Sequence, residues 1–211
     1  MNGQPEIPAG DLLLRPWRSG DAAALVRAWA DPEIRRWGRY GAAVPETDTV
    51  GQWLDWNRRQ WEFGLRVGFA VCRGARDGGG VVGSILLRDF ARTATHVGHI
   101  GDTGEVGYWI VPGWRGRGAA TSALAAVTRW AFTAADDGGL GLSRIELRHS
   151  VGNPGSCRVA AKAGYRHEAT MRESFRYADG ARHDEHLHAR LAGEDDEIRE
   201  ARGHDGADGP G

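Results

Sequence analysis

Cysteine is scarce in this chain of 211 residues: Cys72 and Cys157 are too few for a disulfide framework, and both are expected to stay reduced. The sequence has no apolar run near the roughly 18 residues that a membrane-spanning helix needs, and residues 1–10 lack the apolar core of a signal peptide. Its 32 glycines follow no repeat period, which argues against collagen-like and solenoid folds. We therefore expect a cytoplasmic protein with no membrane partner.

Charge is unevenly distributed, although the formal net charge is only -1. Residues 193–211 contain seven acidic side chains and two arginines, so the other 192 residues hold 25 basic and 21 acidic side chains. This positive excess suits a polyanionic cofactor, but it is too small and too evenly spread to favour nucleic-acid binding. We expect a flexible N-terminus over residues 1–10, one domain over residues 11–192, and a disordered, acidic, glycine-rich tail over residues 193–211.

Hydrophobic periodicity predicts strands and helices around one core. Strands are expected over residues 12–17, 67–73, 81–89, 104–111, 143–150, 166–177 and 183–191. Helices are expected from residue 19 or 21 to residue 30, from residue 32 onward for a short stretch, and over residues 47–63, 121–135 and 154–163. Antiparallel hairpins combined with helices at fixed places indicate an α+β fold.

The most informative segment is a basic, glycine-rich stretch that joins the strand of residues 104–111 to a long helix. Residues 113–120 read Gly-Trp-Arg-Gly-Arg-Gly-Ala-Ala, and their small side chains let a ligand approach the backbone amides. The positive end of the helix dipole adds to the two arginines, so a pyrophosphate is the expected guest. Neither an NTPase P-loop nor a dinucleotide site fits, because Ala119 and Ala120 replace the required Lys and Ser/Thr, and the dinucleotide fingerprint lacks its third glycine.

Two motifs at a suitable separation carry a family resemblance. The first begins at Arg115, reads Arg-x-x-Gly-x-Ala, and resembles the coenzyme A loop of the GCN5-related N-acetyltransferases (GNAT). The second begins at Asn153, reads Asn-x-x-Ser, and continues through a short helix to Lys-x-Gly-Tyr at residues 162–165, as in the later motif of this superfamily. Over residues 12–191 the order of elements is most similar to the ribosomal-protein alanine acetyltransferase (RimJ/RimL-like) branch.

The resemblance implies a mixed, mostly antiparallel central sheet flanked by helices, and an enzyme that transfers acetyl from acetyl-CoA directly to a primary amine. The acceptor is expected to be a protein or peptide N-terminus or a small amine. The alternatives are an acetyltransferase for an antibiotic or metabolite amine and a non-catalytic coenzyme A binding module, and a homodimer is left open. The residues implied in cofactor binding are Ile110, Val111, Arg115, Gly116, Arg117, Gly118, Ala119, Ala120, Asn153 and Ser156.

Acetyl transfer requires a base, a proton donor and a polarised carbonyl, and the resemblance implies residues for each role. Glu105 is the candidate general base, acting on the amine through a water, and the competing interpretation is an exposed carboxylate at a strand start. Ser156 is the candidate proton donor to the departing thiolate, because Ala160 stands where many members of the superfamily have a tyrosine. This serine could equally cap the next helix. A backbone amide near Ile110 or Val111 is expected to polarise the carbonyl, where by resemblance the central strands separate.

Histidines gather near the C-terminus, but their spacing does not predict a metal site. In a strand, His183 and Glu185 face one side whereas His186 and His188 face the other, so three ligands do not converge. We therefore expect no metal. Cys157 is expected to be a small core residue, and a covalent acetyl-cysteine route is the less favoured one.

Six of the nine tryptophans lie in the first third of the chain, where the substrate-binding helices of such enzymes are found. Most are expected to pack in the core, while Trp37 and Trp53, together with Tyr108, are candidates for the acceptor-binding wall. Residues 1–70 contain nine acidic and nine basic side chains. An acidic trough for a polycation is therefore not expected.

Overall fold

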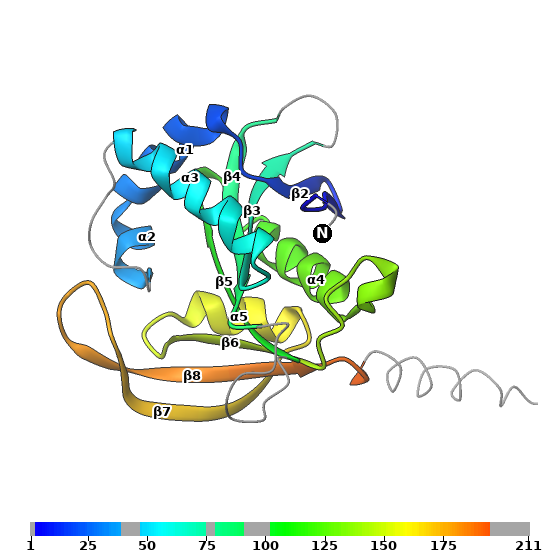
Figure 1. Cartoon of the computed structure of the whole chain (residues 1–211). Helices are drawn as coiled ribbons and strands as arrows, with labels where there is room; N and C mark the ends of the chain where they lie inside the picture. The colour runs from blue at the N-terminus through cyan, green and yellow to red at the C-terminus, as the bar shows by residue number, and fades with distance from the viewer. Residues whose placement is uncertain (1–2, 39–46, 75–78, 91–101, 195–211) are drawn as a thin grey trace, which may run out of the picture.

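A computed structural model of the chain describes residues 3–38, 47–74, 79–90 and 102–194. Its centre is an eight-stranded sheet in the order β1-β2-β3-β4-β5-β6-β8-β7 (Figure 1), and every neighbouring pair is antiparallel except β5 and β6. The strands are β1 (Ile7–Ala9), β2 (Leu12–Pro16), β3 (Arg66–Arg73), β4 (Val81–Arg88), β5 (Thr103–Ile110), β6 (Arg144–Ser150), β7 (Arg166–Arg176) and β8 (Arg182–Leu191). The predicted α+β class with a mostly antiparallel sheet is confirmed.

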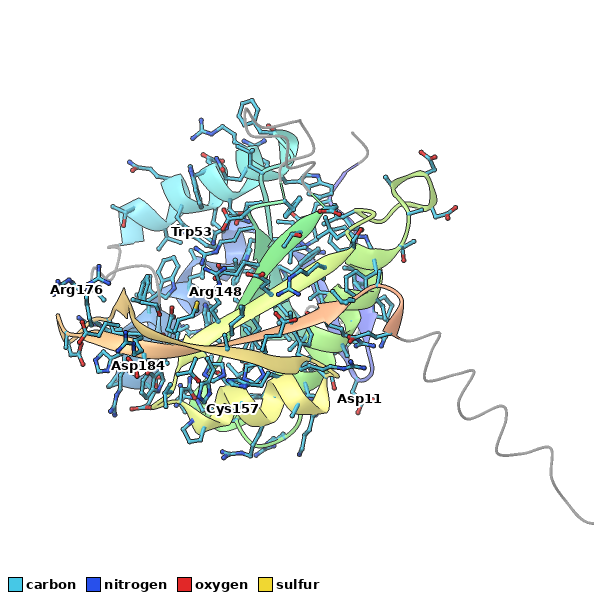
Figure 2. The ribbon with its side chains drawn as sticks, turned by 90° about the horizontal axis from the view of Figure 1, so that it is seen from below. Asp11, Trp53, Arg148, Cys157, Arg176 and Asp184 are labelled. Carbon is cyan, nitrogen blue, oxygen red and sulfur yellow. The ribbon has the colours of Figure 1, made fainter. Side chains whose placement is uncertain are left out.

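Helices cover both faces of this sheet. The helices are α1 (Ala22–Ala30), α2 (Pro32–Trp37), α3 (Thr47–Glu62), α4 (Ala119–Phe132) and α5 (Pro154–Lys162), with short 3-10 turns at Ser19–Asp21, Pro112–Trp114 and Ala135–Asp137. Figure 2 shows Trp53 of α3 and Cys157 of α5 on opposite sides of the sheet. We call the side of α1 to α3 the front face and the side of α4 and α5 the back face. None of the helices within the described ranges combines the length and apolar character needed to cross a bilayer.

The central strands are buried on both sides because helices lie on both sides. Six consecutive residues of β3 and six of β4 are buried. Such uninterrupted burial is typical of strands that are covered on both faces. On the back face Phe69 is fully buried and meets the Trp130 ring of α4 edge-on at 5.6 Å between centroids. On the front face Gly68 leaves room for Asn57 of α3, whose Nδ2 donates to the Gly68 carbonyl at 3.4 Å.

The two parallel strands separate halfway along their length. Strands β5 and β6 are paired from Thr103 with Arg144 as far as Val106 with Leu147. Beyond that point β5 pairs with β4, and the last three residues of β6 pair with β8. The separation that was predicted for the central strands is therefore present, and it opens the sheet where the functional motifs meet.

Both predicted ends of the domain need correction. Ile7 and Ala9, expected in a flexible N-terminus, are buried in β1, which pairs with β2. A strand of three residues is too short for its periodicity to be recognised in a sequence. At the other end, Glu194 was assigned to the tail, but it accepts from the Leu191 amide and pairs with Arg166 at 3.1 Å. The remainder of the predicted tail, residues 195–211, lies outside the described residues.

Candidate active site

The glycine-rich segment that is predicted to bind an anion lies at the beginning of α4. Gly116 and Gly118 adopt positive φ angles of 73° and 83°, which residues other than glycine rarely adopt. Gly118 is the N-cap of the helix. The helix starts at Ala119, two residues before the predicted start, and the Ser122 amide donates to the Gly118 carbonyl at 2.9 Å. The amides of the first turn have no earlier carbonyl within the helix to bind. They stand at the wall of a cleft of about 910 Å³, where an anion can accept from them.

Arg115 was predicted to add charge to this site, and the structure gives its side chain protein partners. Its Nε donates to the Ile110 carbonyl at 3.0 Å, and its guanidinium lies 2.6 Å from Asp31. Asp31 also caps α2, because its carboxylate accepts from the Ile34 amide at 2.9 Å. Burial alone raises the pKa of Asp31, but the bonds from Arg115 and Ile34 outweigh it and hold the pKa below its usual range. Arg115 thus fastens the loop to α2.

The backbone at the end of β5 distinguishes two amides that the sequence left equal. The Val111 amide donates to the Val82 carbonyl at 3.0 Å, and the Val111 carbonyl accepts from the Trp114 amide. Of the two candidate amides, that of Val111 is therefore already bonded within the sheet. Amides alternate in direction along a strand, so the Ile110 amide points away from β4, toward the separation between β5 and β6.

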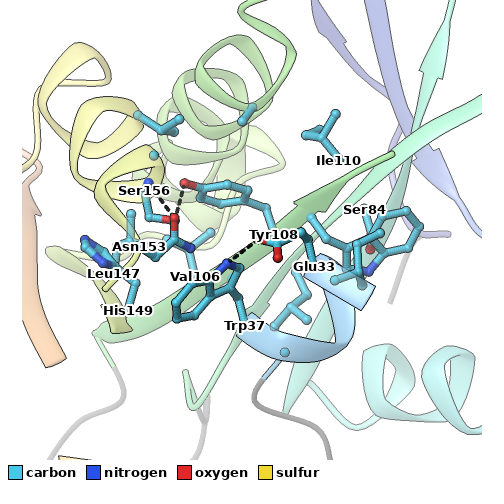
Figure 3. A pocket seen from close by; sticks show the side chains of 18 of the residues that line it. Glu33, Trp37, Ser84, Val106, Tyr108, Ile110, Leu147, His149, Asn153 and Ser156 are labelled. Atoms are coloured by element: carbon cyan, nitrogen blue, oxygen red, sulfur yellow. Dashed lines mark hydrogen bonds between the residues drawn. The ribbon is translucent and has the colours of Figure 1, made fainter. Parts of the chain in front are cut away.

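A tyrosine and a serine meet at the same place on the back face (Figure 3). The Tyr108 hydroxyl donates to the Ser156 Oγ at 3.1 Å. Asn153 is the N-cap of α5, and its side-chain oxygen accepts from the Ser156 amide at 3.3 Å, so the serine hydroxyl is not the cap. Burial raises the pKa of Tyr108 to about 12, with the bond to Ser156 lowering it in part. Tyr108, predicted on the acceptor wall, thus binds the serine of the second motif.

Glu105 lies on the same strand but on the other face. Its side chain shares the front face with Trp109, whose ring lies 6.2 Å from that of Trp17. Arg88 is its cross-strand partner on β4, and a guanidinium nitrogen of Arg88 lies 2.5 Å from the Glu105 carboxylate. Glu105 therefore lines the cleft as half of an ion pair.

The two tryptophans predicted for the acceptor wall both line the cleft. Trp53 of α3 is held edge-on by Trp17 and Trp29, with centroids 5.7 and 5.2 Å away. Trp37 of α2 donates from its indole nitrogen to the Glu33 carboxylate at 3.0 Å (Figure 3), and it meets the Tyr177 ring edge-on. Aromatic packing thus fixes the front wall of the cleft.

Several charged residues of the cleft escaped the sequence analysis. The described lining contains seven arginine or lysine side chains and two carboxylates, Glu33 and Glu105. Arg35 of α2, Arg66 of β3 and Arg88 of β4 belong to this set on the front face. These residues come from separate elements, so no local pattern in the sequence marks them as a group. Basic side chains therefore line the cleft on both faces of the sheet, and Arg88, Arg115 and Arg148 among them pair with Glu105, Asp31 and Glu146.

Comparison with known proteins identifies the family. Residues 11–166 match the family described as Acetyltransferase (GNAT) domain. The chain is 26% identical over 191 residues to the uncharacterized N-acetyltransferase YoaA of Bacillus subtilis, covering 88% of this chain and 96% of YoaA. Among solved structures, RimJ of Mycobacterium smegmatis, in complex with CoA-disulfide, is 28% identical with a TM-score of 0.71, covering 90% of this chain and 87% of RimJ.

A second solved structure shares the fold. The ribosomal-protein-S5-alanine acetyltransferase of Vibrio fischeri is 19% identical with a TM-score of 0.74, covering 90% of this chain and 97% of that protein. At this identity the likeness concerns the fold. The family match covers more than half of the chain. The chain therefore belongs to the GNAT family, resembles its RimJ/RimL-like branch, and is an N-acetyltransferase that uses coenzyme A.

Proposed function

We propose that the protein transfers acetyl from acetyl-CoA directly to the primary amine of a protein or peptide N-terminus, or of a small amine. One observation carries this proposal: a single cleft joins the anion site at α4 to the aromatic front wall, through the separation of β5 and β6. Two substrates that enter from opposite faces can therefore meet at the separation. Holding both reactants in one geometry is a large part of catalysis for a bimolecular transfer.

The cofactor side supplies binding and protonation. The amides of residues 116–120 would bind the pyrophosphate, with Arg117 adding charge, and Asn153 would hold the turn beside the pantetheine arm. The Ile110 amide would donate to the thioester oxygen as negative charge develops on it. Ser156 would give its proton to the departing thiolate and take one from Tyr108, whose high pKa keeps its hydroxyl protonated at neutral pH.

The front face supplies deprotonation. An α-amino group has a pKa near 8, so a water held by the Glu105 carboxylate can remove its proton. Arg88 restrains that carboxylate and keeps it pointing into the cleft. Cys157 is not assigned a covalent role, because burial raises the pKa of its thiol and its sulfur faces His186 at 3.1 Å.

The charge of the cleft favours one class of acceptor. The described lining contains seven basic side chains, three of them in ion pairs, and two carboxylates, so it offers a polycation few acidic partners and suits an amine whose remaining groups are neutral or acidic. A peptide N-terminus with acidic residues downstream meets this description. We therefore expect polyamines to be poor acceptors.

The test is an acceptor screen that measures release of free coenzyme A thiol. The matched pair consists of one Ala-initiated acidic peptide and the same peptide with an acetylated N-terminus, with spermine as the polycationic acceptor. We expect turnover with the free peptide, none with the acetylated peptide, and little with spermine. Equal or faster turnover of spermine would refute the acceptor class. Tight coenzyme A binding without turnover of any amine in a broad screen would mean that the protein is a non-catalytic module.

A further inference from the structure

Four side chains that have no role in the proposed chemistry lie close together on the back face, next to Ser156. His149 on β6 is the cross-strand partner of His186 on β8, and His188 lies two residues further along β8 on the same face. Helix α5 covers that face and brings Cys157 to it, so that the Cys157 Sγ lies 3.1 Å from the His186 Nδ1. We call His149, Cys157, His186 and His188 the back-face cluster. One potential ligand atom from each of the four lies within 4.8 Å of all the others.

The ring nitrogens of two of these histidines are buried without a partner. His149 is 6% exposed and His188 is 5% exposed. Within the described part of the chain, the His149 Nε2 and both ring nitrogens of His188 have no hydrogen-bond partner. Buried polar atoms in proteins are nearly always satisfied, so unpartnered nitrogens gathered within 4.8 Å of further ligand atoms point to a ligand.

One histidine is already oriented as a metal ligand requires. The His149 Nδ1 lies 2.9 Å from the Ser150 carbonyl oxygen. A carbonyl only accepts, so Nδ1 carries the proton and Nε2 presents its lone pair to the cluster. Histidines that bind metals commonly donate their second ring N–H to such an oxygen, which fixes both the tautomer and the ring orientation.

We propose that the back-face cluster is a structural zinc site with three imidazole ligands and one thiolate. Zinc binds such nitrogen and sulfur ligands tetrahedrally, and four protein ligands close the site to substrate. Ligand atoms of a tetrahedral zinc site are about 3.3–3.7 Å apart, so the four side chains must approach one another by about 1 Å on binding. The Cys157 thiol releases one proton to solvent as its sulfur takes the metal.

The two buried histidines of the cluster have lowered pKa values. Burial, together with the neighbouring His149, His167 and His186, lowers the pKa of His188 to about 4. Burial likewise lowers the pKa of His149.

The sequence expectation of no metal considered the C-terminal strand alone. The predicted alternation of side chains along β8 is correct, because the Glu185 side chain faces away from the cluster and accepts from the Ser174 and Tyr177 hydroxyls. The remaining ligands come from β6 and α5, and no sequence spacing connects them to β8. Zinc at this position would fasten the first turn of α5, which carries Ser156, to β6 and β8.

The experiment uses the untagged full-length protein after removal of metals with a chelator. Cobalt(II) serves as the spectroscopic probe for zinc, and zinc itself is quantified by elemental analysis. We expect one ion per chain, the ligand-field bands of tetrahedral cobalt, a thiolate-to-cobalt charge-transfer band, and a rise in melting temperature with zinc. Cys157→Ser should lose the charge-transfer band, and His188→Gln should lose binding at stoichiometric metal.

His183→Asn is the matched control, because His183 lies on the same strand, faces the other side and binds Asp179 at 2.7 Å. It should bind zinc as the wild type does. Failure of the wild type to bind stoichiometric zinc, or unchanged binding and spectrum in Cys157→Ser, would overturn the proposal and leave a neutral cluster of packed histidines. If His188→Gln does not fold, Cys157→Ser provides the test, because Cys157 is partly exposed and its replacement should leave the fold intact.

Discussion

Replacing Gly118 by alanine tests the cofactor site at its most constrained point. Gly118 has φ 83° and ψ -5°, and a Cβ built on it meets no atom within 4 Å. Alanine would thus be strained but not clash, at a net cost of about 1 kcal/mol in the free energy of unfolding. For a chain of this size that lowers the melting temperature by about 2–4 °C.

The effect on coenzyme A binding should be larger than the effect on stability. The new methyl group would project into the cleft beside the first amides of α4, where the pyrophosphate must approach the backbone. Losing one charge-assisted hydrogen bond costs about 1.5–3 kcal/mol, or about ten- to a hundredfold in the dissociation constant. Titration calorimetry with coenzyme A measures that constant directly.

Gly138→Ala is the matched control for strain. Gly138 has φ 87° and ψ 9°, its added Cβ also meets nothing within 4 Å, and it does not line the cleft. Both variants should lose the same stability, and Gly118→Ala alone should lose affinity for coenzyme A. Equal affinity in the two folded variants would refute the placement of the pyrophosphate at α4.

Three further predictions concern catalysis and stability. Glu105→Gln should lower the transfer rate by about 100-fold or more with unchanged coenzyme A affinity. Higher pH should partly restore the rate, because the amine then loses its proton unaided. A pH-rate profile equal to that of the wild type would exclude Glu105 as the base. Ser156→Ala and Tyr108→Phe should each slow transfer without rescue at high pH, and the double variant should be no slower than Ser156→Ala if the two hydroxyls act in series. Asp21→Asn breaks the buried ion pair with Arg15 at 2.7 Å and should cost about 3 kcal/mol of unfolding free energy at pH 7 by denaturant titration.

The pH dependence of the last variant follows from the direction of the pKa shift. Burial raises the pKa of Asp21, but the bonds from Arg15 and the Arg18 amide outweigh it, so the folded pKa lies below the usual value. A lowered folded pKa contributes stability above the unfolded pKa of about 4, and that contribution is lost as the pH falls through the folded value. The wild type and Asp21→Asn should therefore differ fully at pH 5 to 7 and converge only below about pH 4. A gap that persists in acid would show that the loss comes from packing.

The parts of the site that could be predicted are those encoded by neighbouring residues. The anion loop is local, because glycines at positive φ and a helix that starts beside them lie within six residues. The cap of α5 is local as well, since Asn153 binds an amide three residues later. Strands and helices could be told apart for the same reason, because the periodicity that distinguishes them lies within each segment.

The parts that could not be predicted depend on contacts between distant segments. Tyr108 and Ser156 are 48 residues apart in the chain, and Arg115 and Asp31 are 84 residues apart. No spacing rule joins such pairs, because their approach is set by the strand order of the sheet and by the packing of α2 and α5 on it. The back-face cluster was missed for the same reason, since it needs β6, β8 and α5 together.

Strand β5 places the residues of the two proposed proton transfers on opposite faces of the sheet. Side chains alternate along a strand, so Glu105 and Trp109 face the front while Tyr108 faces the back, where α5 presents Ser156. The proposed base for the amine and the hydroxyls proposed to protonate the thiolate are thus separated by the thickness of the sheet. A thioester can reach both only where the sheet is open, beyond the last pair of β5 with β6 at Val106 and Leu147. The separation of the strands is therefore a requirement of the proposed chemistry, in which the Ile110 amide at the same opening would bind the thioester oxygen.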